Sequence, residues 1–307
     1  MSVSLTSTYA GSFSGKYISA ALLSAQTLDK GLITVMPNVK YKSVLQVGSY
    51  NDIVADATCD YTASGTLTLS EKIIQPEEFQ VNVDICKKDL VNSWEAEQMG
   101  YSAFDKLAPS LSDFIIAHTA AKVASKIESN IWSGQTANAG EFDGFYYLAT
   151  AGGSGCTAVT GTAVTAANVV DEMGKVVDAI GQNVYGKDDL FIYVAPNVAR
   201  AYIRALGGFG ANGLGANGVN AQGTTWFNNG ALSFDGIPVV VAQGLPASSM
   251  MAAQKSNMFF GTGLLNDTNE VRVLDMAELD GSQNVRVIMR FTAAVAMGIN
   301  SDVVIYA

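Results

Sequence analysis

The longest helical pattern in the chain constrains its fold more than any other feature. Pro109 precedes Ser110-Leu111-Ser112-Asp113, which has the Ser-x-x-Asp spacing of a capping box. Apolar residues then recur at helical spacing, at Leu111, Phe114, Ile115, Val123, Ile127 and Ile131, and Gly134 ends the run. A helix of this length is a rod of roughly 35 Å. The sequence therefore predicts one long helix that serves as the backbone of the fold.

The segment before this helix, from Gly31 to Cys86, shows strand patterns uninterrupted by helical ones. Apolar and polar residues alternate at Val39–Lys42, at Thr66–Leu69 and most cleanly at Phe79–Ile85. These patterns predict a long hairpin. Such a hairpin has little core of its own and is marginal in isolation, so it needs a partner surface.

The rest of the chain mixes short helices and strands. Further helices are predicted at Lys88–Met99, between a Thr165 cap and Gly181, and at Pro196–Leu206, and strands at Leu190–Val194, Phe234–Val241, Val285–Phe291 and Val303–Tyr306. No regular strand-helix-strand rhythm connects them, which indicates an α+β fold.

Residues 1–30 are rich in Ser, Thr, Ala and Gly, with widely spaced apolar residues. One or two helical turns are expected around Ile18–Leu28. Because the segment has too little apolar surface to fold alone, it is expected to be an arm that becomes ordered only against neighbours.

The composition is more apolar than a soluble monomer of 307 residues requires: 49% of residues are hydrophobic and only 15% are charged. A membrane or a large protein interface could bury this surplus. A spanning helix needs about 20 consecutive apolar residues. The most apolar stretch, Ala231–Ala253, is broken by Asp235, Pro238, Gly244 and Pro246. A secretory signal is not supported either, because the apolar run Ile18–Leu23 is short and starts late. Burial between subunits is the remaining explanation.

Charge and cysteine content exclude several classes of function. The net charge is −10 and no Lys/Arg-rich run exists, so tight nucleic-acid binding is disfavoured. The sequence has three cysteines, Cys59, Cys86 and Cys156, which are widely separated. Because their number is odd, a disulfide framework is not expected. With His118 as the single histidine, no Cys/His zinc cluster is expected. We expect synthesis in a reducing cytoplasm, and no catalytic, cofactor-binding or metal-binding residues.

The best match to a ligand-binding motif is Gly208–Gly213, which fits G-x-G-x-x-G, and Gly213–Gly218 fits it again. A dinucleotide-binding motif follows a strand and opens a helix, whereas this one follows a predicted helix. We interpret residues 207–223 as a flexible, low-complexity loop.

Other polar groups also have simple interpretations. His118 is expected to be a packed or interface residue of the long helix. The pairs Glu77-Glu78 and Asp188-Asp189 are expected to be solvated turn charges, and Asn266-Asp267-Thr268 a turn.

Several segments, in their order along the chain, resemble the major capsid proteins of tailed phages, which have the Hong Kong 97-type fold. The segments are Lys126–Gly134, Phe142–Tyr146, Val194–Asn197, Phe234–Pro246, Met258–Gly261, Val271–Val273 and Val285–Ala307. Each is weak alone, but together they cover most of the chain from Gly31 onward.

The resemblance implies a division of the chain into five parts. They are an N-terminal arm (1–30), an extended β-hairpin (31–80), a peripheral domain with a spine helix at 110–134 (81–150), an axial domain (151–292) and closing strands of the peripheral domain (293–307). In some such capsids a hairpin lysine bonds covalently to a neighbour's asparagine. Lys40 and Lys42 lie on this hairpin, but ordinary surface lysines are the simpler interpretation.

The resemblance further implies a structural protein without enzymatic activity. It would assemble as hexamers and pentamers into an icosahedral head around double-stranded DNA, located in the virion and assembled in the host cytoplasm. Implied partners are a portal, a separate scaffolding protein and decoration or head-tail proteins, and the DNA would be held without sequence-specific contact. The short segment before the hairpin suggests that scaffolding is a separate chain or is not used.

Three alternatives remain open. The same fold could form an encapsulin-like compartment or the shell of a gene-transfer particle, which would differ in cargo. A nucleotide-binding α/β enzyme would use the glycine-rich loop. A surface-layer or adhesin protein would be recovered from the cell exterior.

Overall fold

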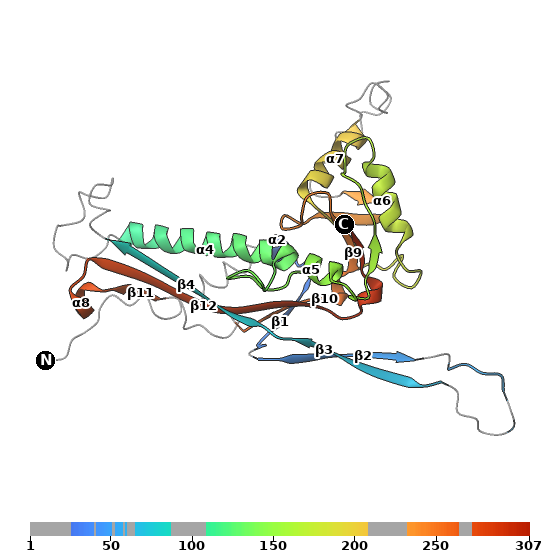
Figure 1. Ribbon diagram of the computed structural model, residues 1–307, viewed down its shortest axis with the longest axis horizontal. Coiled ribbons are helices and arrows are strands. Elements are labelled where there is room, and N and C mark those ends of the chain that lie inside the picture. The colour runs from blue at the N-terminus through green and yellow to red at the C-terminus, as the bar shows by residue number, and fades with distance from the viewer. Residues whose placement is uncertain are drawn as a thin grey trace.

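The protein is described by a computed structural model, which covers residues 26–39, 41–50, 53–57, 59, 65–86, 109–207, 232–263 and 272–307 (Figure 1). The helices are α2 (Gln26–Asp29), α4 (Pro109–Ser133), α5 (Phe145–Thr150), α6 (Val169–Asp178), α7 (Pro196–Gly207) and α8 (Ala277–Asp280), with 3-10 turns at Lys255–Asn257 and Asn300–Asp302. The strands are β1 (Thr34–Pro37), β2 (Ser43–Tyr50), β3 (Leu67–Ile74), β4 (Glu77–Cys86), β5 (Thr157–Val159), β6 (Leu190–Val194), β7 (Ser233–Phe234), β8 (Ile237–Val241), β9 (Met250–Gln254), β10 (Met258–Thr262), β11 (Arg272–Asp275), β12 (Asn284–Met297) and β13 (Val304–Tyr306).

The long helix α4 lies over an elongated sheet whose central strand is β12 (Figure 1). β12 pairs antiparallel with β4, β10 and β11, and β1 adds to β10 in parallel. Alternate residues of β12, Val285, Val287 and Met289, are buried. On the other face, Arg286 and Arg290 are exposed and Ile288 is half-buried. One face of the sheet thus contributes to the core and the other faces outward, as the period of two requires.

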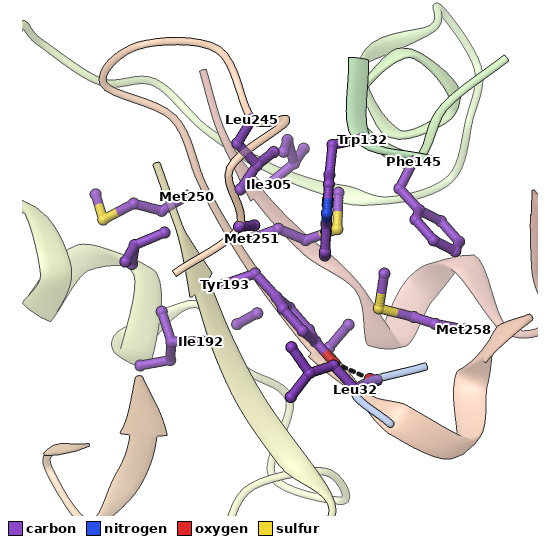
Figure 2. Packing of buried hydrophobic residues seen from close by; sticks show 14 of the residues in the cluster. Leu32, Trp132, Phe145, Ile192, Tyr193, Leu245, Met250, Met251, Met258 and Ile305 are labelled. Carbon is purple, nitrogen blue, oxygen red and sulfur yellow. Dashed lines mark hydrogen bonds between the residues drawn. The ribbon is translucent and has the colours of Figure 1, made fainter. Parts of the chain in front are cut away.

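A second lobe stands at the end of α4 and contains a six-stranded sheet with the order β5-β13-β9-β6-β8-β7, together with α6 and α7 (Figure 1). Its central strands are buried: Ile192, Tyr193, Met251 and Ile305 have almost no exposed surface. In Figure 2, Tyr193 and Met251 lie beside Trp132 of α4. The same core therefore joins the lobe to the long helix.

The antiparallel pair β2–β3 projects away from both sheets (Figure 1). Its eight paired positions run from Ser43↔Ile74 to Tyr50↔Leu67. At its base Leu45 and Ile74 pack in a small cluster with Val39, Ala294 and Ala296. The rest of the ribbon has no layer above or below it among the described residues.

The structure confirms the main helices and strands expected from the sequence. The predicted long helix agrees with α4 to within one residue at each end, and β6, α7 and β8 lie where expected. Gly134 ends α4, where its N–H donates to the carbonyl of Asn130. A Cβ at Gly134 would lie 2.3 Å from the carbonyl oxygen of Phe142, so the close approach of the following loop requires glycine. The helix predicted at Lys88–Met99 lies outside the described residues.

Two local predictions were wrong. The strand expected at Val39–Lys42 is absent from the described residues of that segment, because Asn38 adopts a left-handed turn (φ 64°) that separates β1 from β2. The predicted cap residue of α6, Thr165, lies one turn too early. Asn168 is the N-cap, and its Oδ1 accepts hydrogen bonds from the N–H and hydroxyl of Thr165. Thr165 thus belongs to the turn that leads into the helix.

Residues 293–307 were expected to form the closing strands of the peripheral domain, but the observed strand pairing places them in two different sheets. β12 is continuous across position 293 and completes the elongated sheet. β13 instead pairs with β9 and β5 in the six-stranded sheet. The two lobes are therefore tied together by the C-terminal strands, because consecutive strands of the chain lie in different sheets.

Candidate assembly surfaces

The two faces of the β2–β3 hairpin differ in chemistry. Directly opposed residues of an antiparallel pair share a face. The register therefore places Val44 with Ile73, Gln46 with Glu71 and Gly48 with Leu69 on one face, followed by Leu67. On this face Val44 is 48% exposed, Leu67 47%, Leu69 65% and Ile73 55%. We call these four residues the apolar row of the hairpin.

The opposite face of the hairpin carries Thr68 and Ser70, with Leu45 and Val47 only partly exposed. The four apolar residues form two groups, Val44 with Ile73 and Leu67 with Leu69, on either side of the polar pair Gln46–Glu71. Exposed apolar groups on a projecting ribbon are typical of a protein interface. The hairpin is therefore incomplete as a folded unit, and its apolar row is the part that needs a partner.

The base of the hairpin is buried, in contrast to its exposed apolar row. Ile74, at the end of β3, is 1% exposed. A Cβ at Gly261 of β10 would lie 2.8 Å from Ile74 Cδ1, so the glycine makes room for this side chain. The base of the ribbon is thus fixed to the elongated sheet, and this fixes the direction in which the ribbon leaves it.

The first described residues are held on α4 by buried hydrogen bonds. Thr27 donates its N–H to Glu128 Oε2 (3.0 Å) and its hydroxyl to Glu128 Oε1 (2.5 Å). The indole N–H of Trp132 donates to the same hydroxyl at 2.9 Å. Because both Thr27 and Glu128 are buried, this junction defines where the N-terminal segment meets the body of the protein.

A second bond secures this segment to the six-stranded lobe. The hydroxyl of Tyr193 donates to the carbonyl of Leu32 at 2.7 Å (Figure 2). Its ring lies 5.0 Å from that of Trp132. Burial raises the pKa of Tyr193 far above its usual value, so the phenol stays a donor.

A network of polar side chains joins α6 to β13 in the six-stranded lobe. The buried carboxylate of Glu172 accepts hydrogen bonds from Lys175, from the hydroxyl of Tyr306 at 2.8 Å and from the hydroxyl of Thr162 at 3.0 Å. These contacts, chiefly that with Lys175, lower the pKa of Glu172. The sequence did not predict this network, because Tyr306 lies 134 positions from Glu172.

The polar residues singled out in the sequence do not converge on a site within the described part of the chain. Glu78 is exposed, and Glu77 accepts a hydrogen bond from Thr136. The ammonium of Lys42 lies 5.3 Å from the ring of Tyr41. Residues 208–218, Lys40 and Asn266–Thr268 lie outside the described residues, as does the side chain of His118.

Asp189 differs from its expected role as a solvated turn charge. It accepts hydrogen bonds from Ser256 and Gln254, and the bond from the Ser256 hydroxyl is the main cause of its lowered pKa. Asp189 therefore joins the start of β6 to the turn after β9.

The described residues contain no metal-binding cluster of three or more His, Cys, Asp or Glu side chains. Cys59, Cys86 and Cys156 are free thiols. None of the helices in the described part of the chain combines the length and apolarity needed to span a membrane.

Comparison with known proteins gives matches through structure alone. No protein-family model matches the sequence, and neither does any curated protein. The capsid of a native GTA particle matches with a TM-score of 0.61 at 16% identity, covering 94% of this chain and 89% of that chain. Gordonia phage Cozz matches with a TM-score of 0.58 at 12% identity (92% and 86% covered), and the capsid of Myoviridae phage XM1 with 0.57 at 14% identity (91% and 90% covered).

These similarities cover more than nine-tenths of the chain. The protein has the mixed helix-and-sheet fold of phage capsid proteins, as the order of its sequence motifs predicted.

Proposed function

We propose that this protein is the major structural subunit of a phage-type capsid, which assembles as hexamers and pentamers into a closed icosahedral shell. The observation that carries the proposal is the apolar row of the β2–β3 hairpin, which projects from a well-packed body and has no partner surface within the described part of one copy. Symmetric repetition would provide that surface from the next copy. The shared fold with capsid proteins supports the same conclusion.

In this proposal the parts of the molecule take the roles of a Hong Kong 97-type subunit. The six-stranded lobe is the axial domain, which surrounds the five-fold and six-fold axes. The elongated sheet and α4 are the peripheral domain, and β2–β3 is the extended loop that lies over an adjacent subunit. Because β13 pairs inside the six-stranded sheet, we assign it to the axial domain. β12 is then the last strand of the peripheral domain along the chain.

The partners follow from the same proposal. A portal, a scaffolding protein and decoration or head-tail proteins would meet the shell, which would form in the host cytoplasm and remain in the virion. The net charge of −10 suits a wall that contains DNA without adhering to it.

A shell with a different cargo is the second candidate. A virus-like particle from Pyrococcus furiosus shares the fold with a TM-score of 0.53 at 8% identity, and the GTA capsid shares it as well. Sequencing of nucleic acid extracted from purified particles separates the candidates: packaged phage genomes support the phage head. Fragments of host DNA indicate a gene-transfer particle, and protein cargo indicates a compartment.

The test of assembly uses two neighbouring residues on opposite faces of β3. Leu69→Asp places a charge in the apolar row, whereas Ser70→Asp places the same charge on the other face. We expect purified wild-type protein to form rings or shells in sedimentation velocity and electron microscopy. Leu69→Asp should abolish them without changing the circular dichroism spectrum, and Ser70→Asp should retain them. Wild-type protein that stays monomeric at every concentration and salt would contradict the proposal.

A further inference from the structure

The helices α6 and α7 of the six-stranded lobe carry opposite net charge. α7 contains two arginines, Arg200 and Arg204, and no acidic residue, so its net charge is +2. α6 contains three acidic residues and one lysine, which give it a net charge of −2. In Figure 1, α7 lies at the left of the lobe and α6 at the right. One lobe therefore presents two helices of equal and opposite charge.

The two arginines of α7 have no acidic partner in the described part of the chain. Arg200 and Arg204 are four residues apart, so their side chains are neighbours on the helix surface. Both are exposed, and neither forms an ion pair with a described residue. Like charges at this spacing destabilise a helix, so an anionic partner would stabilise α7. We call these two residues the basic line of α7.

The acidic line of α6 consists of Asp171 and Asp178, which are seven residues, or about two helical turns, apart. Both are exposed and form no ion pair with a described residue. Lys175 lies between them, but its ammonium is 2.8 Å from the carboxylate of buried Glu172. The backbone beside the line is uncovered, because a Cβ at Gly174 would meet no atom within 4 Å. A second molecule can therefore come close to the acidic line.

We propose that the basic line of one copy binds the acidic line of the next copy, so that the lobes join head to tail in a ring. The same chain supplies both charges, so no other anionic partner is needed. Because the lines lie on different helices, a copy that binds one neighbour through its basic line still offers its acidic line to another. Repeated contacts of this kind close into a ring when the rotation between copies permits it.

This inference rests on the proposed shell function and deepens it, because it names side chains that join copies within a ring. The two proposals can fail separately. Rings formed by the wild-type protein test the shell proposal, whereas charge reversal on α6 and α7 tests this contact.

Charge reversal and its rescue test the pairing of the two lines. Arg200→Glu with Arg204→Glu reverses α7, and Asp171→Lys with Asp178→Lys reverses α6. Each reversed protein should need at least about tenfold more protein to form rings in sedimentation velocity, because like charges then meet at every contact. A chain that carries all four substitutions should form rings at the wild-type concentration, since the facing charges are opposite again.

Mixing the two reversed proteins tests the head-to-tail arrangement. Their facing charges are opposite only where the two proteins alternate around the ring, which is possible in a hexamer but not in a pentamer. Native mass spectrometry of the equimolar mixture should therefore show hexamers with equal numbers of the two chains and no pentamers. Mixed dimers without rings would indicate a two-fold contact and would overturn the head-to-tail ring.

The control is Lys122→Glu with Lys187→Glu, which changes the net charge as much as the reversal of α7 but at exposed lysines outside both helices. It should form rings as the wild-type protein does, with an unchanged circular dichroism spectrum. If reversal of α7 left wild-type-like rings, this inference would be wrong and the shell proposal would stand. If reversal of α6 did not rescue reversal of α7, the arginines would belong to another anionic partner, such as DNA. Absence of rings in the wild-type protein would overturn both proposals.

Discussion

The six-stranded lobe and the β2–β3 hairpin are built from similar residues but differ in what covers them. In the lobe, Ile192 and Met251 are covered by neighbouring strands, α6, α7 and the end of α4. In the hairpin, Leu69 and Ile73 are just as apolar and face solvent. Strand propensity is thus satisfied in both regions, whereas burial is complete in only one.

This difference indicates where the stability of one copy comes from. Burying an aliphatic side chain contributes about 1.5–3 kcal/mol. The buried residues of the lobe, of its junction with α4 and of the elongated sheet therefore provide the folding free energy of an isolated copy. The apolar row of the hairpin contributes almost nothing until another surface covers it. If the comparison is right, truncating an apolar side chain should destabilise the fold in the lobe, whereas in the apolar row of the hairpin it should weaken assembly.

The largest effect is expected at the junction of the lobe with α4. Trp132 is 0% exposed, packs near Phe145 and Tyr193, and donates its indole N–H to Thr27. Trp132→Ala should lower the free energy of unfolding by about 3–5 kcal/mol, because it leaves a large cavity and removes a buried hydrogen bond. Urea unfolding followed by circular dichroism measures this change.

Tyr147→Ala is the matched control, since this aromatic side chain of α5 is partly exposed. Its expected cost is about 1 kcal/mol or less. If Trp132→Ala were no more harmful than Tyr147→Ala, the junction would not be part of the stabilising core.

A smaller effect is expected at Gly144, where the loop after α4 approaches the end of the helix closely. A Cβ at Gly144 would lie 2.5 Å from the carbonyl oxygen of Asn130 and 2.7 Å from the carbonyl of Trp132. Gly144→Ala should therefore cost about 1–3 kcal/mol, since the loop after α4 must shift. Gly174 in α6 borders open space, where an added Cβ would meet no atom within 4 Å, so Gly174→Ala should instead stabilise the protein by about 0.5–1 kcal/mol. Differential scanning calorimetry gives both shifts, and equal signs for the two variants would contradict this account.

The sequence predicted those parts of the fold that depend on local patterns. The period of α4, the alternation of β4 and β12, and the turn at Asp235-Gly236, where both residues have positive φ, are all encoded in neighbouring residues. The order of these segments was enough to indicate a capsid fold.

The remaining features depend on contacts between distant segments. The bonds from Thr27 to Glu128 span 101 positions, and that from Tyr306 to Glu172 spans 134. Neither pair shows a spacing that could have indicated it. The separation of β12 and β13 into different sheets was missed for the same reason, because apolar alternation predicts a strand but not its partner. For the hairpin, alternation was visible, but the register was needed to show that Val44, Leu69 and Ile73 share one face.

The smallest effect on an isolated copy is expected at Ile73 of β3, and its contrast with the adjacent Ile74 gives the sharpest test of the comparison. Ile73 belongs to the apolar row and is 55% exposed, whereas Ile74 is 1% exposed in the cluster at the base. Ile73→Ala should change the free energy of unfolding by about 0.5 kcal/mol or less, and Ile74→Ala should cost about 2–5 kcal/mol. The order should reverse for assembly: Ile73→Ala should raise the protein concentration needed for rings or shells in sedimentation velocity, because the side chain is buried only between copies. If Ile73→Ala changed neither unfolding nor assembly, the apolar row would not be an interface, and the reason for its exposure would have to be sought elsewhere.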